Sequence, residues 1–250
     1  MENKFEVVID NVRKLKAILN TVKDISMDLH LIIEKHQIKL ISYNLDKNVI
    51  IQSILPINCF LSFYLEPDKI IISVDSTNLF KIVNSFKGNN ELKLFIDKVD
   101  YNNGVCKNIG LKYLDDVLKL KLSDDSEKEV FISVLEFERN LSISSCKFKS
   151  IVNSMSLISD EIKIQFDHSE VSFKCVGDFA EQLHIEKVDN NAETNLQVSI
   201  SLQLLKSIVK LSNISEDVII SLNNKSHFQL KYNSLEFGQV NVLIGYVENS

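Results

Sequence analysis

The chain contains one hydrophobic pattern twice, and an internal repeat restricts the fold to two similar units. Residues 15–40 match residues 148–173 at a constant offset of 133, with apolar positions on apolar positions and no gap. Residues 74–96 match residues 200–222 at an offset of 126. The second offset is seven residues smaller, so one connection between the two blocks is shorter in the second copy.

Each copy reads as a strand, a helix, several strands, a second helix and further strands. Asn11 can cap a helix in which Leu15, Ile18, Leu19 and Val22 recur at helical spacing. The spacing predicts helices over 13–23, 78–88, 145–157 and 202–213. Apolar-polar alternation and β-branched runs predict strands over 5–9, 28–33, 38–44, 49–55, 70–74, 91–97, 111–122, 130–135, 161–166, 171–176, 182–188, 196–200, 217–222, 227–232 and 239–244.

These elements predict an α+β protein with two similar domains, each an antiparallel sheet structure with two helices. The predicted domains are residues 1–122 and 138–250, joined by a connector over 123–137 that begins with the acidic run SDDSEKE. Hydrophobic residues make up 45 % of the 250 residues, which is enough for sizeable cores. No apolar stretch approaches the ~20 residues that span a bilayer.

Cysteine usage and the first residues favour a reducing, intracellular environment. The opening MENKFEVVID has acids and no apolar run of the kind found in secretory signals. The four cysteines are far apart and form no C-x-x-C pair, so we expect reduced thiols. The spacing of His and Cys fits no zinc site, and we expect neither metal nor cofactor. Asp115-Asp116, Asp124-Asp125 and the turn residues His36 and His168 are interpreted as solvated polar groups.

Charge is distributed unevenly. The chain has 34 acidic and 28 basic residues and a net charge of −6, yet the four predicted helices contain ten basic residues and no acidic one. The rest of the chain therefore carries −16. A basic surface on an acidic body favours binding of phosphates along one face. The basic helix residues are Arg13, Lys14, Lys16, Lys23, Lys81, Lys87, Lys147, Lys149, Lys206 and Lys210.

The composition of these helices also indicates how nucleic acid would be bound. Lysine dominates, whereas base-edge recognition favours Arg, Asn and Gln in bidentate geometry. The helices offer no aromatic platform beyond Phe80, Phe86 and Phe148, which we expect in the core, whereas single-strand binding favours exposed aromatic side chains. We therefore expect sequence-independent contact with the backbone of duplex DNA.

Several strings resemble the DNA sliding clamps of the proliferating cell nuclear antigen type, over essentially the full length. VRKLKAILNTVKDI (12–25) and VDSTNLFKIVNSFKGN (74–89) resemble the first two helices of that family. SDEIKIQFDHSEVSFKC (159–175) resembles the start of the second domain, and LKYNSLEFGQVNVLIGYVE (230–248) resembles the terminal strand pair and acidic tail. None of these strings is a catalytic signature, and we expect no enzyme.

The resemblance implies a pseudo-sixfold ring of three chains, with the helices lining a hole for duplex DNA and a tethered polymerase. Ring closure would pair edge strands of neighbouring chains, here expected over 111–122 and 181–188. The interface residues implied by the resemblance are Leu111, Tyr113, Val117, Leu118, Leu120, Phe179, Leu183 and Ile185.

The resemblance also implies a pocket for short hydrophobic peptides of replication and repair proteins, and a clamp loader as partner. The sequence departs from the family there: the loop after Tyr43 is longer, the Ala-Pro near the C-terminus is Gly245-Tyr246, and the connector reads EVFISVLEF. The pocket residues implied by position are Tyr43, Val130, Ile132, Ile244, Gly245 and Tyr246.

Alternatives remain within the same fold and outside it. The chain could be one subunit of a heterotrimeric clamp, of the checkpoint type or a paralogue, or a monomeric accessory factor for viral replication or transcription. A small enzyme is the alternative for which the sequence shows no chemistry. The residue usage, rich in Ile, Lys, Asn and Ser, fits a large DNA virus or a low-GC eukaryote, so the expected location is the nucleus or a viral replication site.

Overall fold

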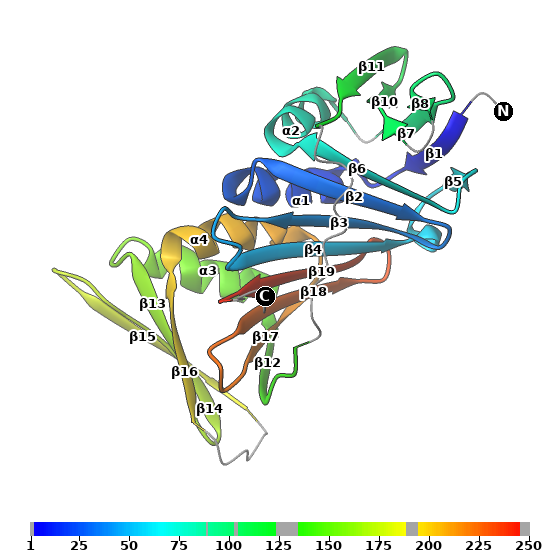
Figure 1. Ribbon diagram of the computed structural model, residues 1–250. Helices are drawn as coiled ribbons and strands as arrows, with labels where there is room; N and C mark the ends of the chain where they lie inside the picture. The colour runs from blue at the N-terminus through cyan, green and yellow to red at the C-terminus, as the bar shows by residue number, and fades with distance from the viewer. Residues whose placement is uncertain (1–2, 89, 103–104, 124–134, 189–194, 246–250) are drawn as a thin grey trace. The chain divides into compact units, whose positions relative to one another are not determined.

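The computed structural model describes residues 3–88, 90–102, 105–123, 135–188 and 195–245 (Figure 1). The chain forms two compact units, which exchange short segments. Unit 1 comprises residues 1–45, 51–132 and 234–240, and unit 2 comprises residues 46–50, 133–233 and 241–250. Residues 130–134 of the strand expected over 130–135 lie outside the described residues, as does most of the expected connector, and Leu135 is described outside any strand.

The two repeats of the sequence give two similar sets of elements. The first repeat contains β1 (Asn3–Ile9), α1 (Val12–Ile25), β2 (Asp28–Glu34), β3 (Gln37–Tyr43), β4 (Val49–Pro56), the 3₁₀ helix η1 (Ile57–Cys59), β5 (Ser62–Leu65), β6 (Lys69–Asp75), α2 (Ser76–Ser85), β7 (Leu92–Asp97), β8 (Tyr101–Asn102), β9 (Val105–Cys106), β10 (Asn108–Tyr113) and β11 (Asp116–Lys121). The second contains β12 (Arg139–Ser144), α3 (Ser145–Met155), β13 (Glu161–Phe166), β14 (Glu170–Val176), β15 (Glu181–Lys187), β16 (Leu196–Ser201), α4 (Leu202–Ile208), the 3₁₀ helix η2 (Val209–Asn213), β17 (Asp217–Leu222), β18 (Phe228–Ser234) and β19 (Gly238–Ile244).

Strand order confirms the duplication. The first repeat has strands in the orders β11-β10-β7-β1-β5 and β4-β3-β2-β6, and the second has β19-β18-β17-β12 and β15-β14-β13-β16. The two sets correspond strand for strand, apart from β5 and the separate β8-β9 pair. In the first repeat, η1 and β5 occupy the connection between β4 and β6, which is where the offset between the copies changes.

Register follows the repeat as well. In the first repeat Leu29 of β2 lies opposite Val74 of β6. The residues that match them in the second repeat, Ile162 of β13 and Ile200 of β16, also lie opposite each other. Because a one-residue slip would move every side chain to the other face of a strand, this agreement fixes the same buried face in both copies.

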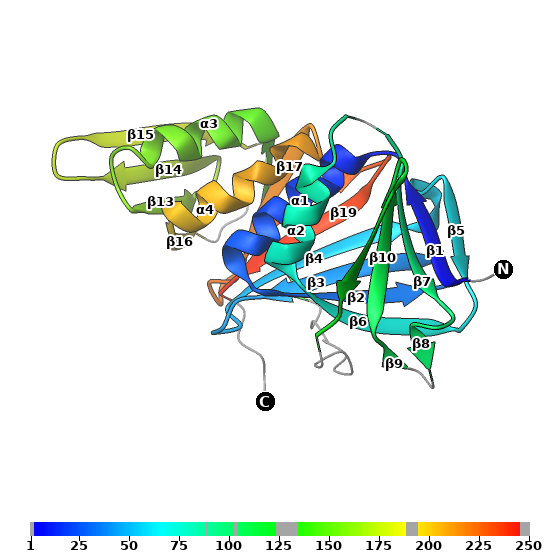
Figure 2. The same ribbon diagram turned by 90° about the horizontal axis from the view of Figure 1, so that it is seen from above.

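The helices of each repeat pack side by side over buried sheet residues (Figure 2). Helix α1 contacts α2 in the first repeat, and α3 contacts α4 and η2 in the second. Each fully buried aliphatic or aromatic side chain contributes about 1.5–3 kcal/mol relative to exposure. The buried apolar residues of the two equivalent helices are Val12, Leu15, Ile18, Leu19 and Val22 in α1 and Phe148, Ile151, Val152 and Met155 in α3.

Some boundaries differ from those expected from the sequence. The single strand expected over 111–122 is wrong, because β10 and β11 form a hairpin whose turn begins at Leu114, with φ of 54°. Helix α1 runs to Ile25 and therefore includes Asp24, and α2 ends at Ser85, before Lys87. The helix expected over 202–213 is α-helical only to Ile208 and continues as 3₁₀ helix.

Candidate nucleic-acid interface

Helix α1 shows how the sequence leaves basic residues on one face. The side chain of Asn11 accepts a hydrogen bond from the Lys14 backbone N–H at 3.3 Å and so caps the helix. The apolar face of α1 is buried, which leaves Arg13 exposed in the first turn of the helix. The other helices, α2, α3, α4 and η2, contain no acidic residue. The only acid in α1, Asp24, forms an ion pair with Lys23 at 2.7 Å.

Two basic residues of α1 are held by neighbouring groups. The Lys16 ammonium donates a hydrogen bond to the Phe86 carbonyl oxygen at 2.5 Å. The Lys23 ammonium lies 4.9 Å from the centre of the Phe80 ring, in addition to its ion pair with Asp24. Phe80 is therefore half-buried beneath a cation rather than available as a stacking platform.

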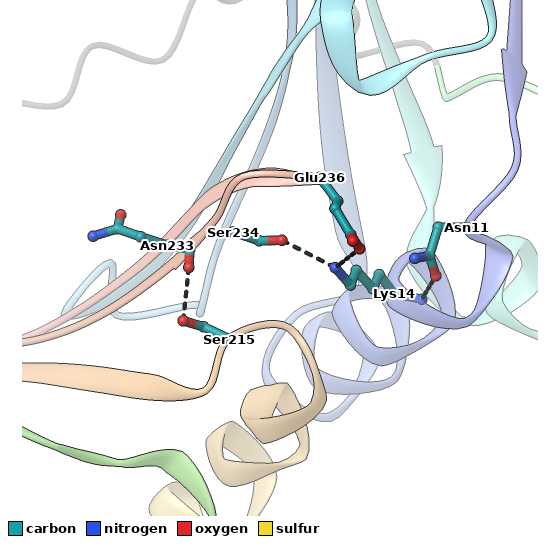
Figure 3. A network of polar contacts seen from close by, with 6 residues as sticks. All are labelled: Asn11, Lys14, Ser215, Asn233, Ser234 and Glu236. Carbon is teal, nitrogen blue, oxygen red and sulfur yellow. Dashed lines mark hydrogen bonds and ion pairs between the residues drawn. The ribbon is translucent and has the colours of Figure 1, made fainter.

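Lys14 is held more completely than the others (Figure 3). Its ammonium forms an ion pair with Glu236 at 3.0 Å and donates a hydrogen bond to the Ser234 hydroxyl at 3.0 Å. The Lys14 side chain is 15 % exposed. In the second repeat, Lys147 forms an ion pair with Glu186 of β15 at 2.6 Å.

The remaining basic residues are more open. Five basic side chains form no ion pair or hydrogen bond with any residue that the structure describes. They are those of Arg13, Lys81, Lys87, Lys149 and Lys206. Arg13, Lys81, Lys87 and Lys206 are exposed, while Lys149 and Lys210 are half-buried. We call Arg13, Lys81, Lys149 and Lys206 the open cations. Each lies on a helix and can reach a phosphate without first breaking an ion pair that the structure describes.

The two edges expected at a subunit interface are unequal. Leu111 and Tyr113 do not belong to an exposed edge, because β10 lies between β7 and β11 and both side chains are buried. Tyr113 stacks on Phe86 at 4.6 Å and donates a hydrogen bond to the Lys87 carbonyl oxygen, so it supports the end of α2. The first edge is therefore β11, where Val117 and Leu118 are exposed and Leu120 is half-buried.

The strand expected over 181–188 does lie at the edge of a sheet. Strand β15 is an edge strand of its sheet, and Leu183 and Ile185 are exposed on it. Phe179, in the turn before β15, is 78 % exposed. Exposed apolar residues on an edge strand are a site for pairing with another chain.

The expected peptide pocket is only partly described. Tyr43 is half-buried and stacks on His30 with ring centres 5.5 Å apart. Ile244 ends β19 and is half-buried, and Gly245 has φ of 79° and donates its backbone N–H to the Asn48 carbonyl oxygen at 2.8 Å. Val130, Ile132 and Tyr246 lie outside the described residues.

Reactive groups of other kinds are scattered. In the described part of the chain, no three His, Cys, Asp or Glu side chains gather as metal ligands would. Cys59, Cys106 and Cys175 are buried, and burial raises the pKa of the Cys106 thiol to about 11. Within the same residues, no helix has the length and apolarity needed to cross a membrane.

The fold matches that of a solved structure over almost the whole chain. A solved structure titled as proliferating cellular nuclear antigen from Entamoeba histolytica superposes with a TM-score of 0.83 over 97 % of this chain and 98 % of that one, at 17 % identity. The duplicated sheet-and-helix architecture is thus that of the sliding clamps.

Sequence comparison points to the same class of protein. Residues 131–246 match the family model described as the C-terminal domain of proliferating cell nuclear antigen. A protein named DNA polymerase sliding clamp, from Nanoarchaeum equitans, is 22 % identical over 92 % of this chain and 94 % of its own length. Proliferating cell nuclear antigen from Chaetomium thermophilum is 22 % identical over 91 % and 92 %. The chain is thus similar to sliding clamps of the proliferating cell nuclear antigen type, over residues 131–246 by the family model and over about nine-tenths of its length by the two relatives.

Proposed function

We propose that the chain is a polymerase processivity factor that encircles duplex DNA and tethers replication and repair proteins to it. The observation that carries this proposal is the contrast in charge between the helices and the whole chain. The helices carry the open cations and, among the described residues, a single acid, whereas the chain has a net charge of −6. Such a surface binds backbone phosphates without reading bases, and a clamp must slide without sequence preference.

We further propose that three copies close into a homotrimeric ring through β11 of one chain and β15 of the next. Each strand is an edge with exposed apolar residues, which supports pairing between copies. The alternatives are a heterotrimeric clamp, in which each edge meets a paralogue, and a monomeric accessory factor for viral replication or transcription.

The partners and location follow from the same proposal. DNA polymerase and other proteins would dock on the clamp through short hydrophobic peptides, and a clamp loader would place the ring on DNA. The protein has no catalytic role in this proposal. Its place of action is the nucleus, or a viral replication site if the chain is viral.

Light scattering across micromolar concentrations tests ring closure. The wild-type chain is expected at three times 28.6 kDa. Leu118→Asp should give folded monomers, because a charge on β11 opposes burial against another copy. The control is Val99→Asp, which adds the same charge at an exposed apolar residue in the turn between β7 and β8. A wild-type mass of one chain would favour the heterotrimer or the monomeric factor instead.

A further inference from the structure

Lys14 and Lys147 occupy the same position in the two repeats, since they are separated by the offset of 133. Each lies in the first turn of its helix, and each forms an ion pair with a glutamate that comes from outside the helices. Lys14 contacts Glu236 in the turn between β18 and β19, at 3.0 Å. Lys147 contacts Glu186 of β15, at 2.6 Å.

The two ion pairs differ in which partner is accessible. The Lys14 side chain is 15 % exposed, while its partner Glu236 is 78 % exposed. The Lys147 side chain is 50 % exposed, while its partner Glu186 is 17 % exposed. Lys14 is thus a largely enclosed cation with an exposed partner, whereas Lys147 is a partly exposed cation held by a sheltered carboxylate.

Glu186 is fixed in place by a polar layer between β15 and α3. It accepts hydrogen bonds from Lys147 and from His184 of its own strand. Burial alone would raise the pKa of Glu186, but these two partners outweigh burial and hold the pKa below its usual range. Two residues before His184, the Gln182 amide donates a hydrogen bond to the Ser154 hydroxyl of α3 at 3.1 Å. The carboxylate therefore stays ionised near neutral pH and remains beside Lys147.

We propose that Glu186 is a positioning residue that withholds Lys147 from duplex DNA, which makes Lys147 a reserve cation. This inference rests on the proposed function, because it concerns the same phosphate-binding surface. A phosphate can recruit Lys147 only by competing with Glu186, and the half-exposed Lys147 side chain can turn outward once that carboxylate loses its charge. Lys14 has no such freedom, because it is largely buried and also bonded to Ser234.

A double-mutant cycle on the full chain tests this inference. The wild type, Lys147→Ala, Glu186→Gln and the double variant would each be titrated with a short fluorescein-labelled duplex, by anisotropy, over a series of NaCl concentrations. The readout is the slope of log affinity against log salt, which steepens by about 0.9 for each additional phosphate that the protein neutralises. A purely structural role of Glu186 would lower stability and leave this slope unchanged.

The expected pattern is specific. Lys147→Ala should leave the slope unchanged, Glu186→Gln should steepen it by about 0.9, and the double variant should return to the wild-type value. Glu181→Gln is the matched control, because it removes one negative charge from the exposed side of the same strand. Glu181→Gln should leave the slope unchanged. If Glu186→Gln unfolds the chain, Glu186→Ala, which also removes the charge, replaces it in the cycle with the same expected slopes.

Other patterns would overturn the inference. A shallower slope for Lys147→Ala alone would mean that Lys147 already binds DNA in the wild type. A steeper slope in both Glu186→Gln and the double variant would mean that Glu186 only repels phosphates. Failure of the proposed function looks different: the slope would then also be insensitive to loss of the open cations Arg13, Lys81, Lys149 and Lys206.

Discussion

Removal of the four open cations gives a salt dependence that can be calculated in advance. Arg13, Lys81, Lys149 and Lys206 form no described ion pair or side-chain hydrogen bond, so each can neutralise one phosphate. Each phosphate that is no longer neutralised lowers the slope of log affinity against log salt by about 0.9, so the fourfold alanine variant should lose about 3.6. When salt is raised from 50 to 200 mM, the affinity of each protein for DNA falls by some factor. That factor should be about 150 times larger for the wild type than for the fourfold variant.

The assay is anisotropy of a labelled duplex across the salt range, with circular dichroism to confirm folding. The control must remove the same charge, because any drop in net positive charge weakens DNA binding to some extent. A matched set of four exposed lysines outside the helices is Lys98, Lys107, Lys112 and Lys225. Equal loss of slope in both fourfold variants would refute the assignment of the DNA surface to the helices.

Two further predictions concern the first repeat. At Gly110 an added Cβ would lie 2.3 Å from the Phe95 ring. Gly110→Ala should therefore destabilise the chain by about 1–3 kcal/mol, and each kcal/mol should lower Tm by about 2–4 °C in a thermal melt. Adding Phe95→Leu to this variant should recover part of the lost stability. Lys119 and Asn108 hydrogen-bond to Asp100 and hold its pKa below the usual range. The stability contributed by this carboxylate is present above its unfolded pKa and is lost as pH falls through the folded pKa. Asp100→Asn should therefore cost about 1–3 kcal/mol in urea unfolding at neutral pH and progressively less in acid. A pH-independent difference would contradict the ion-pair explanation.

Periodicity and the internal repeat were sufficient to predict the architecture. The duplication gave the number of helices in each repeat and most of the matching strands, because buried faces must recur at the same positions. It did not give β12, the six-residue counterpart of β1, although buried and exposed residues alternate along it. Short elements escaped prediction: β5, β8 and β9 have two to four residues, too few for alternation to be visible. The β10-β11 turn was missed because Leu114-Asp115 contains neither Gly nor Pro, although the Asp115-Asp116 pair was a usable signal.

Charge counting predicted which residues are basic but not which are open. It treated all ten as equivalent, and the structure shows Lys14, Lys16, Lys23 and Lys147 bonded to a carboxylate or a carbonyl oxygen. The count of basic residues is therefore an upper limit on how many phosphates the helices can neutralise. Only Asp24 could have been identified as a partner from the sequence, because it follows Lys23 directly.

The partners of Lys14 and Lys147 were beyond the reach of the repeat itself. Glu186 lies on β15, whose counterpart in the first repeat by strand order is β4, and β4 has no acidic residue. Glu236 lies in the turn after β18, whose counterpart is the turn after β10. Equivalent lysines are thus held by carboxylates from non-equivalent elements, so the pairing is not copied along with the fold. Internal symmetry can predict where a cation lies, but only the tertiary structure decides whether that cation is available to a phosphate.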